Sequence, residues 1–231
     1  MNEHVASPTA HKYAPDYFAA QISKSDAKIA WQYGTIFALA GVPQIAGLRV
    51  IDVGAGAGPG LRYLVAHGAI ALGLDHSRYA LATAQTVAPG SAVVLSDSTC
   101  GLPCADAQAD IVLLSELVEH LPDAVPLLRD CWRVLRPGGR IIITTPSLWD
   151  IRRALAPLTG KPWSGDTDPT HVNLYTPLRL ARELQTAGFA AVRWHTGFKP
   201  MGWLSSRRVG VRLALPYPPL IGNGLLAVGM K

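Results

Sequence analysis

The chain of 231 residues has few cysteines and no unbroken apolar stretch long enough to span a membrane. Its three cysteines, Cys100, Cys104 and Cys131, do not suggest a disulfide framework, so a reducing, cytoplasmic location is expected. The longest apolar stretch, 209–228, is interrupted by three prolines, which argues against a transmembrane helix. Residues 1–10 are polar and lack the apolar segment of a secretory signal peptide.

Charged residues are sparse as well, at 16% of the chain against 49% apolar residues. This balance is typical of a folded globular protein rather than a disordered one. The net charge is +5, but the arginines are dispersed, and the one dense cluster is Arg207, Arg208 and Arg212. Because no basic stripe is present, nucleic acid is not an expected partner. Peripheral contact of the arginine cluster with an anionic membrane stays an alternative.

Strand-like and helix-like segments alternate along the chain. Strands are expected at 48–54, 69–75, 91–96, 110–115, 140–146, 190–196 and 223–230, and helices at 59–67, 77–87, 124–135 and 177–187. This alternation predicts one α/β domain over residues 1–231, with a mostly parallel sheet and helices on both faces. A further helix, with Ser25 as its N-cap and Gly41 at its end, belongs to an expected N-terminal helical cap of residues 1–45.

A glycine-rich turn follows the first expected strand. Residues 52–58 read D-x-G-x-G-x-G, and glycine lets backbone N–H groups approach a ligand near the N-terminus of the next helix. Asp75 ends the second strand, where a carboxylate can accept hydrogen bonds from two ribose hydroxyls. These features predict a cofactor that contains adenosine. The NAD fingerprint G-x-G-x-x-G does not fit, because its last glycine falls on Pro59 or Leu61.

The glycine turn resembles motif I of the class I S-adenosylmethionine (SAM) methyltransferases. Three later blocks, at 97–115, 116–123 and 135–146, resemble their counterparts in that family, in the same order and at the usual spacing. The resemblance is close over 24–147 and implies a Rossmann-like sheet of seven strands in the order 3-2-1-4-5-7-6, with the last strand antiparallel. It also implies that SAM is the cofactor.

The resemblance further implies which residues hold SAM. Asp52 would organise the loop and the ammonium group, Asp75 would take the ribose hydroxyls, and Asp97 would reach the adenine amino group. Ser115 would offer its backbone carbonyl near the sulfonium. The remaining cofactor residues implied in this way are Gly54, Gly56 and Gly58, which line the methionine part, and Ser98, which lies beside Asp97.

Methyl transfer to a hydroxyl or a protonated amine can use a general base, and His120, His171 and Glu116 are the candidates. His120 and Glu116 follow the fourth strand, close to the expected position of the acceptor. His171 lies in a segment that resembles the border of the acceptor pocket in related enzymes. Glu116, Glu119 and His120 also resemble residues associated with a divalent metal in ubiquinone-biosynthesis O-methyltransferases. A reaction without a metal is nevertheless expected.

The sequence therefore predicts SAM-dependent methyl transfer to a small molecule, at an oxygen atom. The segment 115–118 reads Ser-Glu-Leu-Val and lacks the Asn/Asp-Pro-Pro-aromatic motif of enzymes that methylate base amino groups. The alternatives are an RNA-directed or lipid-directed methyltransferase and a regulatory subunit that binds SAM without catalysis. Two long segments that the fold does not require, 148–175 and 198–222, are expected to be insertions on the substrate side. The oligomeric state is left open.

Overall fold

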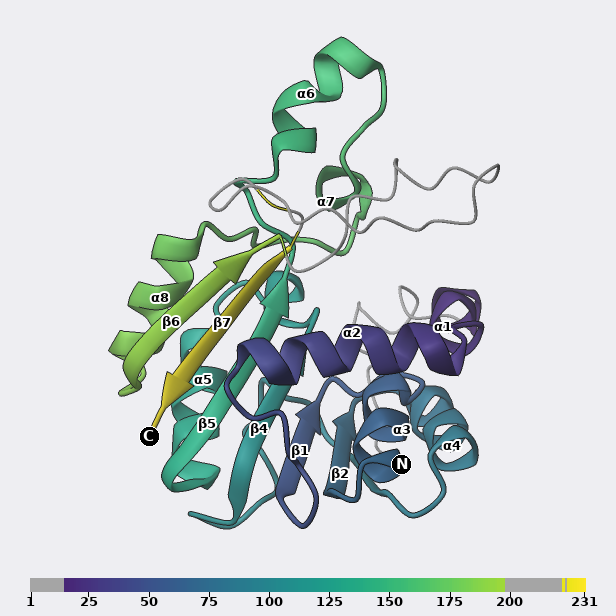
Figure 1. Ribbon diagram of the computed structural model, residues 1–231, viewed down its shortest axis with the longest axis vertical. Coiled ribbons are helices and arrows are strands. Elements are labelled where there is room, and N and C mark those ends of the chain that lie inside the picture. The colour runs from purple at the N-terminus through teal and green to yellow at the C-terminus, as the bar shows by residue number, and fades with distance from the viewer. Residues whose placement is uncertain (1–14, 198–221, 223) are drawn as a thin grey trace, which may run out of the picture.

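The computed structural model describes residues 15–197, 222 and 224–231, and its centre is a seven-stranded sheet (Figure 1). The strands are β1 (Arg49–Val53), β2 (Ile70–Asp75), β3 (Ala92–Leu95), β4 (Ala109–Ser115), β5 (Leu135–Thr145), β6 (Ala190–Thr196) and β7 (Leu225–Met230). Their order is β3-β2-β1-β4-β5-β7-β6, and β7 runs antiparallel to both of its neighbours. The predicted Rossmann-like fold and strand order are confirmed.

Helices cover both faces of this sheet (Figure 1). They are α1 (Pro15–Ile22), α2 (Asp26–Leu39), α3 (Pro59–Ala66), α4 (Arg78–Val87), the short 3-10 helix η2 (Val118–His120), α5 (Val125–Val134), α6 (Ile151–Thr159), α7 (Ser164–Thr167) and α8 (Pro177–Thr186). The side chain of Ser25 accepts a hydrogen bond from the amide of Lys28, which confirms Ser25 as the N-cap of α2.

The core has two layers, one on each face of the sheet. Alternate residues of a strand point to opposite faces, so Val112 and Leu114 of β4 pack in the layer of α5 and α8, whereas Ile111 and Leu113 pack in the layer of α2 and α3. All four of these side chains are buried. Strands buried on both faces read as continuous apolar runs, which is why the sequence alone locates them.

Strand β5 and helix α1 differ from the expected pattern, as do η2, α6 and α7, which the sequence did not predict as helices. Strand β5 begins at Leu135 rather than at residue 140, because Leu135 pairs with Ala109 and the ladder then resumes with Arg140 opposite Ile111. The residues between them form an irregularity in the ladder. Proline has no N–H to donate to a ladder, so Pro137 is tolerated at this irregular position of the strand. Helix α1 was not expected from the sequence, and it lies with α2 within residues 1–45, the expected N-terminal cap.

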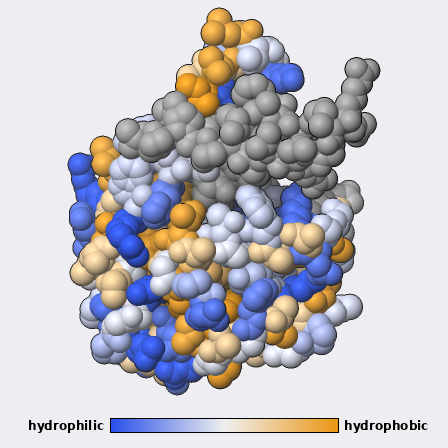
Figure 2. Space-filling view, viewed as in Figure 1, coloured by the Kyte–Doolittle hydropathy of each residue, from blue (hydrophilic) through white to orange (hydrophobic). Residues whose placement is uncertain are grey.

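The expected insertion 148–175 contains α6 and α7 and projects beyond the carboxyl ends of the strands (Figure 1). None of the residues of α6 is buried, and Leu158 is 83% exposed. Figure 2 shows hydrophobic side chains at this projecting end of the molecule. The second expected insertion, 198–222, lies outside the described residues apart from Gly222. Among the described residues, no helix has the length and apolar character needed to cross a membrane.

Candidate functional site

The glycine-rich loop joins β1 to α3 at the carboxyl edge of the sheet. The amides of Gly54 and Ala55 both donate to the carbonyl of Leu74 in β2, at 2.8 and 3.0 Å, so the loop is tied to the neighbouring strand. Gly56 has a φ of +54°, and a Cβ at this position would overlap Oε1 of Gln21 in α1. Glycine at residue 56 is required chiefly by the left-handed backbone, because the atoms that a Cβ would meet are the far end of the flexible Gln21 side chain.

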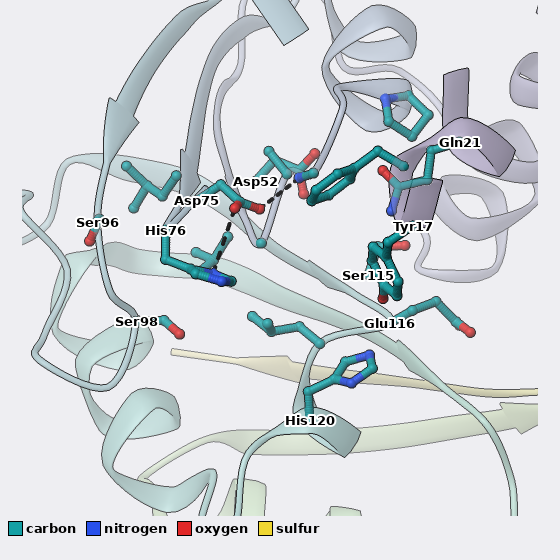
Figure 3. Close-up of a pocket in the computed structure, with 18 of the residues that line it drawn as sticks. Tyr17, Gln21, Asp52, Asp75, His76, Ser96, Ser98, Ser115, Glu116 and His120 are labelled. Carbon is teal, nitrogen blue, oxygen red and sulfur yellow. Dashed lines mark hydrogen bonds and ion pairs between the residues drawn. The ribbon is translucent and has the colours of Figure 1, made fainter. Parts of the chain in front are cut away.

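A cavity that we call the loop cavity opens beside this loop (Figure 3). Its walls come from α1 and α2, from the carboxyl ends of β1, β2 and β4, and from the segments that follow β1 to β4. The lining residues are Tyr17, Phe18, Gln21, Lys24, Gln32, Tyr33, Asp52, Val53, Gly54, Ala55, Gly56, Pro59, Leu74, Asp75, His76, Ser96, Ser98, Ser115, Glu116, Leu117 and His120. The cavity lies where ligands bind in open α/β sheets, at the switch in strand order between β1 and β4.

Asp75 faces the loop cavity and also holds the loop in place. Its Oδ2 accepts a hydrogen bond from the amide of Gly56 at 2.9 Å, and its Oδ1 accepts one from the amide of Ser77 at 2.8 Å. The ring of His76 lies close by, with Nδ1 3.7 Å from Oδ1. Because an ionised carboxylate has about four acceptor positions, Asp75 keeps the capacity to bind further donors from a ligand.

Asp52 is 2% exposed and lies at the base of the loop cavity. Burial and the nearby charge of Asp75 raise its pKa to about 7. Within the described residues, Oδ1 of Asp52 has no hydrogen-bond partner. A buried carboxylate oxygen in this state is costly unless a donor reaches it, so the site suits a ligand that brings a cationic or N–H group to this point.

The structure leaves two of the expected cofactor residues off the cavity wall. Gly58 has a φ of +89°, and a Cβ there would lie 2.9 Å from Cα of Ala84, so its close neighbour is α4. The carboxylate of Asp97 accepts hydrogen bonds from the hydroxyl and the amide of Thr99, at 2.7 and 2.9 Å, and these bonds lower its pKa. By contrast, Ser98 and Ser115 line the cavity as expected.

A second cavity, which we call the histidine cavity, lies next to the first. Its lining residues are Tyr17, Glu116, Glu119, His120, Pro146, Asp150, Arg152, Trp163, Asp168 and His171. Residues from the insertion 148–175 supply one side of it. Tyr17, Glu116 and His120 line both cavities, so these three residues mark the place where the two meet.

The two histidines of this cavity are held by backbone carbonyls. Nδ1 of His120 lies 3.2 Å from the carbonyl oxygen of Thr170, and Nδ1 of His171 lies 2.8 Å from that of Gly165. A carbonyl can only accept, so the neutral ring carries its proton on Nδ1 and Nε2 becomes the basic nitrogen. Burial lowers the pKa of His120, which favours its neutral form at pH 7. The rings are 5.0 Å apart between centroids.

Glu119, fully buried in η2, adds a carboxylate to the two histidines. Its Oε2 accepts a hydrogen bond from the hydroxyl of Thr145 at 2.9 Å. One potential ligand atom from each of Glu119, His120 and His171 lies within 4.8 Å of the others, an arrangement that could hold a metal ion. Glu116 does not belong to this group. The group therefore differs from the set of Glu116, Glu119 and His120 that the sequence suggested.

Glu116 itself has a φ of +55°, a left-handed conformation that is uncommon for residues other than glycine. Its amide donates to the carbonyl of Thr144 in β5 at 2.8 Å, which fixes the residue where β4 ends. Strained backbone of this kind is often found at functional sites, and here it occurs where the two cavities meet.

Comparison with known proteins identifies the domain. Residues 51–143 match a family described as methyltransferase domain. Residues 51–143 therefore form a methyltransferase domain. The matched part of the domain contains the glycine loop, Asp75 and the strand β4 that ends at Ser115, and its cofactor is SAM.

The similar proteins agree with this assignment at the level of the domain. A probable SAM-dependent methyltransferase of Mycolicibacterium smegmatis is 30% identical over 144 residues, which are 62% of this chain and 52% of that protein. A ubiquinone biosynthesis O-methyltransferase of Methylococcus capsulatus is 36% identical over 111 residues, 44% of each chain. The chain thus spans about half the length of the curated relatives that it matches.

Solved structures share the fold over nearly the whole chain. A SAM-dependent methyltransferase from Archaeoglobus fulgidus superposes with a TM-score of 0.66 at 20% identity, covering 94% of this chain and 99% of that one. One from Mesorhizobium loti gives a TM-score of 0.61 at 21% identity, covering 87% and 98%. At these identities the likeness concerns the fold of the methyltransferase domain.

Sequence reasoning missed the contribution of α1 to the site. Tyr17 and Gln21 line the loop cavity, yet they lie before the part of the chain in which the motifs are found. The one available signal was the pair of adjacent aromatic residues Tyr17 and Phe18.

Proposed function

We propose that the protein transfers the methyl group of SAM to a small molecule bound in the histidine cavity, at an oxygen atom of that acceptor. The observation that carries the proposal is that the two cavities meet at His120, Glu116 and Tyr17. A cofactor in one cavity and an acceptor in the other would have their reacting atoms at this junction. When bound, SAM supplies a methyl group on a positively charged sulfur.

The cofactor roles follow from the lining of the loop cavity. We propose that Asp52 takes the ammonium group of the methionine part, since its buried Oδ1 needs a donor. Asp75 accepts the ribose hydroxyls, and the loop at Gly54 and Gly56 accommodates the methionine part. Ser98 and Ser115 complete the wall. Both hydrogen bonds from Thr99 reach Oδ1 of Asp97, so the proposed contact with the adenine would use Oδ2.

The acceptor hydroxyl would lose its proton to His120. Support comes from the hydrogen bond between Nδ1 and the carbonyl of Thr170, which makes Nε2 the basic nitrogen, and from the lowered pKa of the ring. His171 and Glu116 are the other candidates, and both line the histidine cavity. A positioned base contributes about 10²–10⁴-fold, and alignment with exclusion of water supplies about 7–11 kcal/mol.

An oxygen acceptor is supported by the relatives that are ubiquinone biosynthesis O-methyltransferases, although only about half of their length is matched. The same base would also serve a protonated amine, so nitrogen is the second candidate. The RNA-directed and lipid-directed alternatives transfer the same methyl group to a different acceptor, whereas a regulatory subunit would bind SAM and transfer nothing. We propose that the reaction needs no metal, and the group of Glu119, His120 and His171 provides the test of that point.

The experiment is a screen for S-adenosylhomocysteine (SAH), the product that every SAM-dependent methyl transfer shares. The purified protein is incubated with SAM and matched pairs of small acceptors that differ only in the accepting atom, such as a phenol and the corresponding aniline. SAH is measured by mass spectrometry, and Asp75→Ala serves as the control for cofactor-dependent turnover. We expect SAH with the hydroxyl member of at least one pair and a methyl ether as its co-product.

Three results would contradict the proposal in different ways. Turnover of the aniline alone would move the reaction to nitrogen. Turnover of RNA or of lipid vesicles without any small acceptor would support one of the two other transfer reactions. Tight SAM binding without SAH from any acceptor class would support the regulatory subunit.

A further inference from the structure

Helix α1 is attached directly to the glycine loop. Oε1 of Gln21 accepts a hydrogen bond from the amide of Ala57 at 3.0 Å. Phe18 is 2% exposed and packs against Ala57 and against Ala80 of α4. The position of α1 over the loop cavity is therefore set by one polar and one apolar contact, both of which involve Ala57 of the loop.

These contacts direct Tyr17 toward the junction of the two cavities. The rings of Tyr17 and Phe18 meet edge to face, with centroids 5.2 Å apart and an interplanar angle of 87°. Since Phe18 is buried against the loop, this contact limits the positions open to the ring of Tyr17. Figure 3 shows Tyr17 on the same side of the loop cavity as Ser115 and Glu116.

The junction is well suited to a positively charged group. Of the described residues, Tyr17, Glu116 and His120 line both cavities. Glu116 offers a carboxylate and Tyr17 an aromatic ring, and neither a lysine nor an arginine belongs to this trio. An aromatic ring adds attraction for a cation through the negative potential of its face.

We propose that the ring of Tyr17 forms a wall of the methyl-transfer point and recognises the positive charge of the sulfonium. This inference rests on the proposed function, because it requires the sulfur of SAM to lie where the cavities meet. It assigns to α1 a part in the chemistry as well as in covering the cofactor. No acceptor needs to be known for its test, since the charged SAM and the neutral SAH differ at this point.

The test compares the affinities of SAM and SAH by calorimetry in the whole protein. Tyr17→Leu removes the ring, and Tyr17→Phe keeps it without the hydroxyl. The matched control is Tyr79→Leu: Tyr79 also lies near Phe18, at 6.0 Å between centroids, but lines neither cavity. We expect Tyr17→Leu to weaken SAM binding about 2- to 30-fold and to leave SAH binding unchanged. Tyr79→Leu should bind both ligands as the unaltered protein does, and Tyr17→Phe should keep the ratio of SAM affinity to SAH affinity.

An equal loss of SAM and SAH affinity in Tyr17→Leu would overturn the proposal, because Tyr17 would then only seat α1. Unchanged affinity for both ligands would overturn it too. Melting temperatures verify that each variant is folded, and Tyr17→Met replaces Tyr17→Leu if the latter is not. If the unaltered protein binds neither ligand, the proposed function fails, whereas failure of the Tyr17 variants alone refutes only the role of Tyr17.

Discussion

The amide of Gly56 donates a hydrogen bond to the carboxylate of Asp75 at 2.9 Å in a buried position. This bond joins the loop that follows β1 to the last residue of β2, two elements separated by α3 in the chain. Asp75, the proposed partner of the ribose hydroxyls, therefore also supports the loop that would hold the methionine part of the cofactor. Changes at either residue should therefore affect both parts of the cofactor site.

Asp75→Ala should bind SAM much more weakly than the unaltered protein. The variant loses the proposed charge-assisted hydrogen bonds to the ribose, worth about 1.5–3 kcal/mol each, and the bond from the amide of Gly56. Asp75→Asn keeps one acceptor oxygen and should show a smaller loss. Calorimetry gives the affinities, with Asp106→Ala as a control at an exposed carboxylate paired with Arg133. Unchanged SAM affinity in a folded Asp75→Ala protein would refute the role of Asp75.

Gly56→Val should abolish SAM binding and leave a folded domain. The left-handed backbone at residue 56 disfavours a branched side chain, and the new Cβ would overlap Gln21. Gly47→Val is the matched control, because Gly47 has a φ of +76° but no atom within 4 Å of an added Cβ. Both variants carry backbone strain, and only Gly56→Val adds the clash at the cavity. Normal SAM binding by Gly56→Val would mean that the loop does not hold the ligand.

The sheet could be predicted from the sequence because its strands are buried on both faces. Ile111 to Leu114 and Ile141 to Ile143 form apolar runs that leave few other possibilities for these segments. The spatial order of the strands came from the resemblance to a known family, since periodicity alone does not order strands. The early start of β5 was missed because the proline and glycines at 137–139 are typical of a turn.

The site could be predicted only where its residues follow strand ends. His171 and Glu119 are separated by 52 positions in the chain and approach each other because the amides of Val172 and Asn173 both donate to the carbonyl of Glu119. No local pattern reports such a contact. Asp97 was placed in the site by its motif, yet in the structure its Oδ1 accepts two hydrogen bonds from Thr99 and the residue does not line the loop cavity.

The affinity for SAM should depend on the ionisation of Asp52. Its pKa is raised from 3.8 to about 7, chiefly by burial, so the ligand-free protein holds this proton more tightly than the unfolded chain does. The contribution of Asp52 therefore lowers the free energy of unfolding as pH rises from about 4 to 7. If the carboxylate must ionise to take the ammonium group, SAM affinity should rise up to about tenfold per pH unit below pH 7 and level off above it.

Asp52→Asn is the control for this pH profile. Its side chain has no ionisation, so the variant should bind SAM weakly and with a flat dependence on pH between 5 and 7. Calorimetry at half-unit steps, together with melting temperatures of the ligand-free proteins, separates the two effects. A flat profile for the unaltered protein would show that Asp52 does not take the ammonium group.

Divalent cations should change neither the melting temperature nor the turnover of the protein if the reaction needs no metal. Glu119, His120 and His171 come close enough to bind an ion, so millimolar Mg²⁺, Mn²⁺ and Zn²⁺ are the appropriate challenge. We expect no rise in melting temperature with these ions and no loss of turnover after treatment with a chelator. A rise that disappears in both Glu119→Gln and His171→Gln would contradict this prediction, because stabilisation by an ion requires a site in the folded protein. In that case a bound metal at the histidine cavity could lower the pKa of an acceptor hydroxyl, and His120 would be a ligand rather than the base.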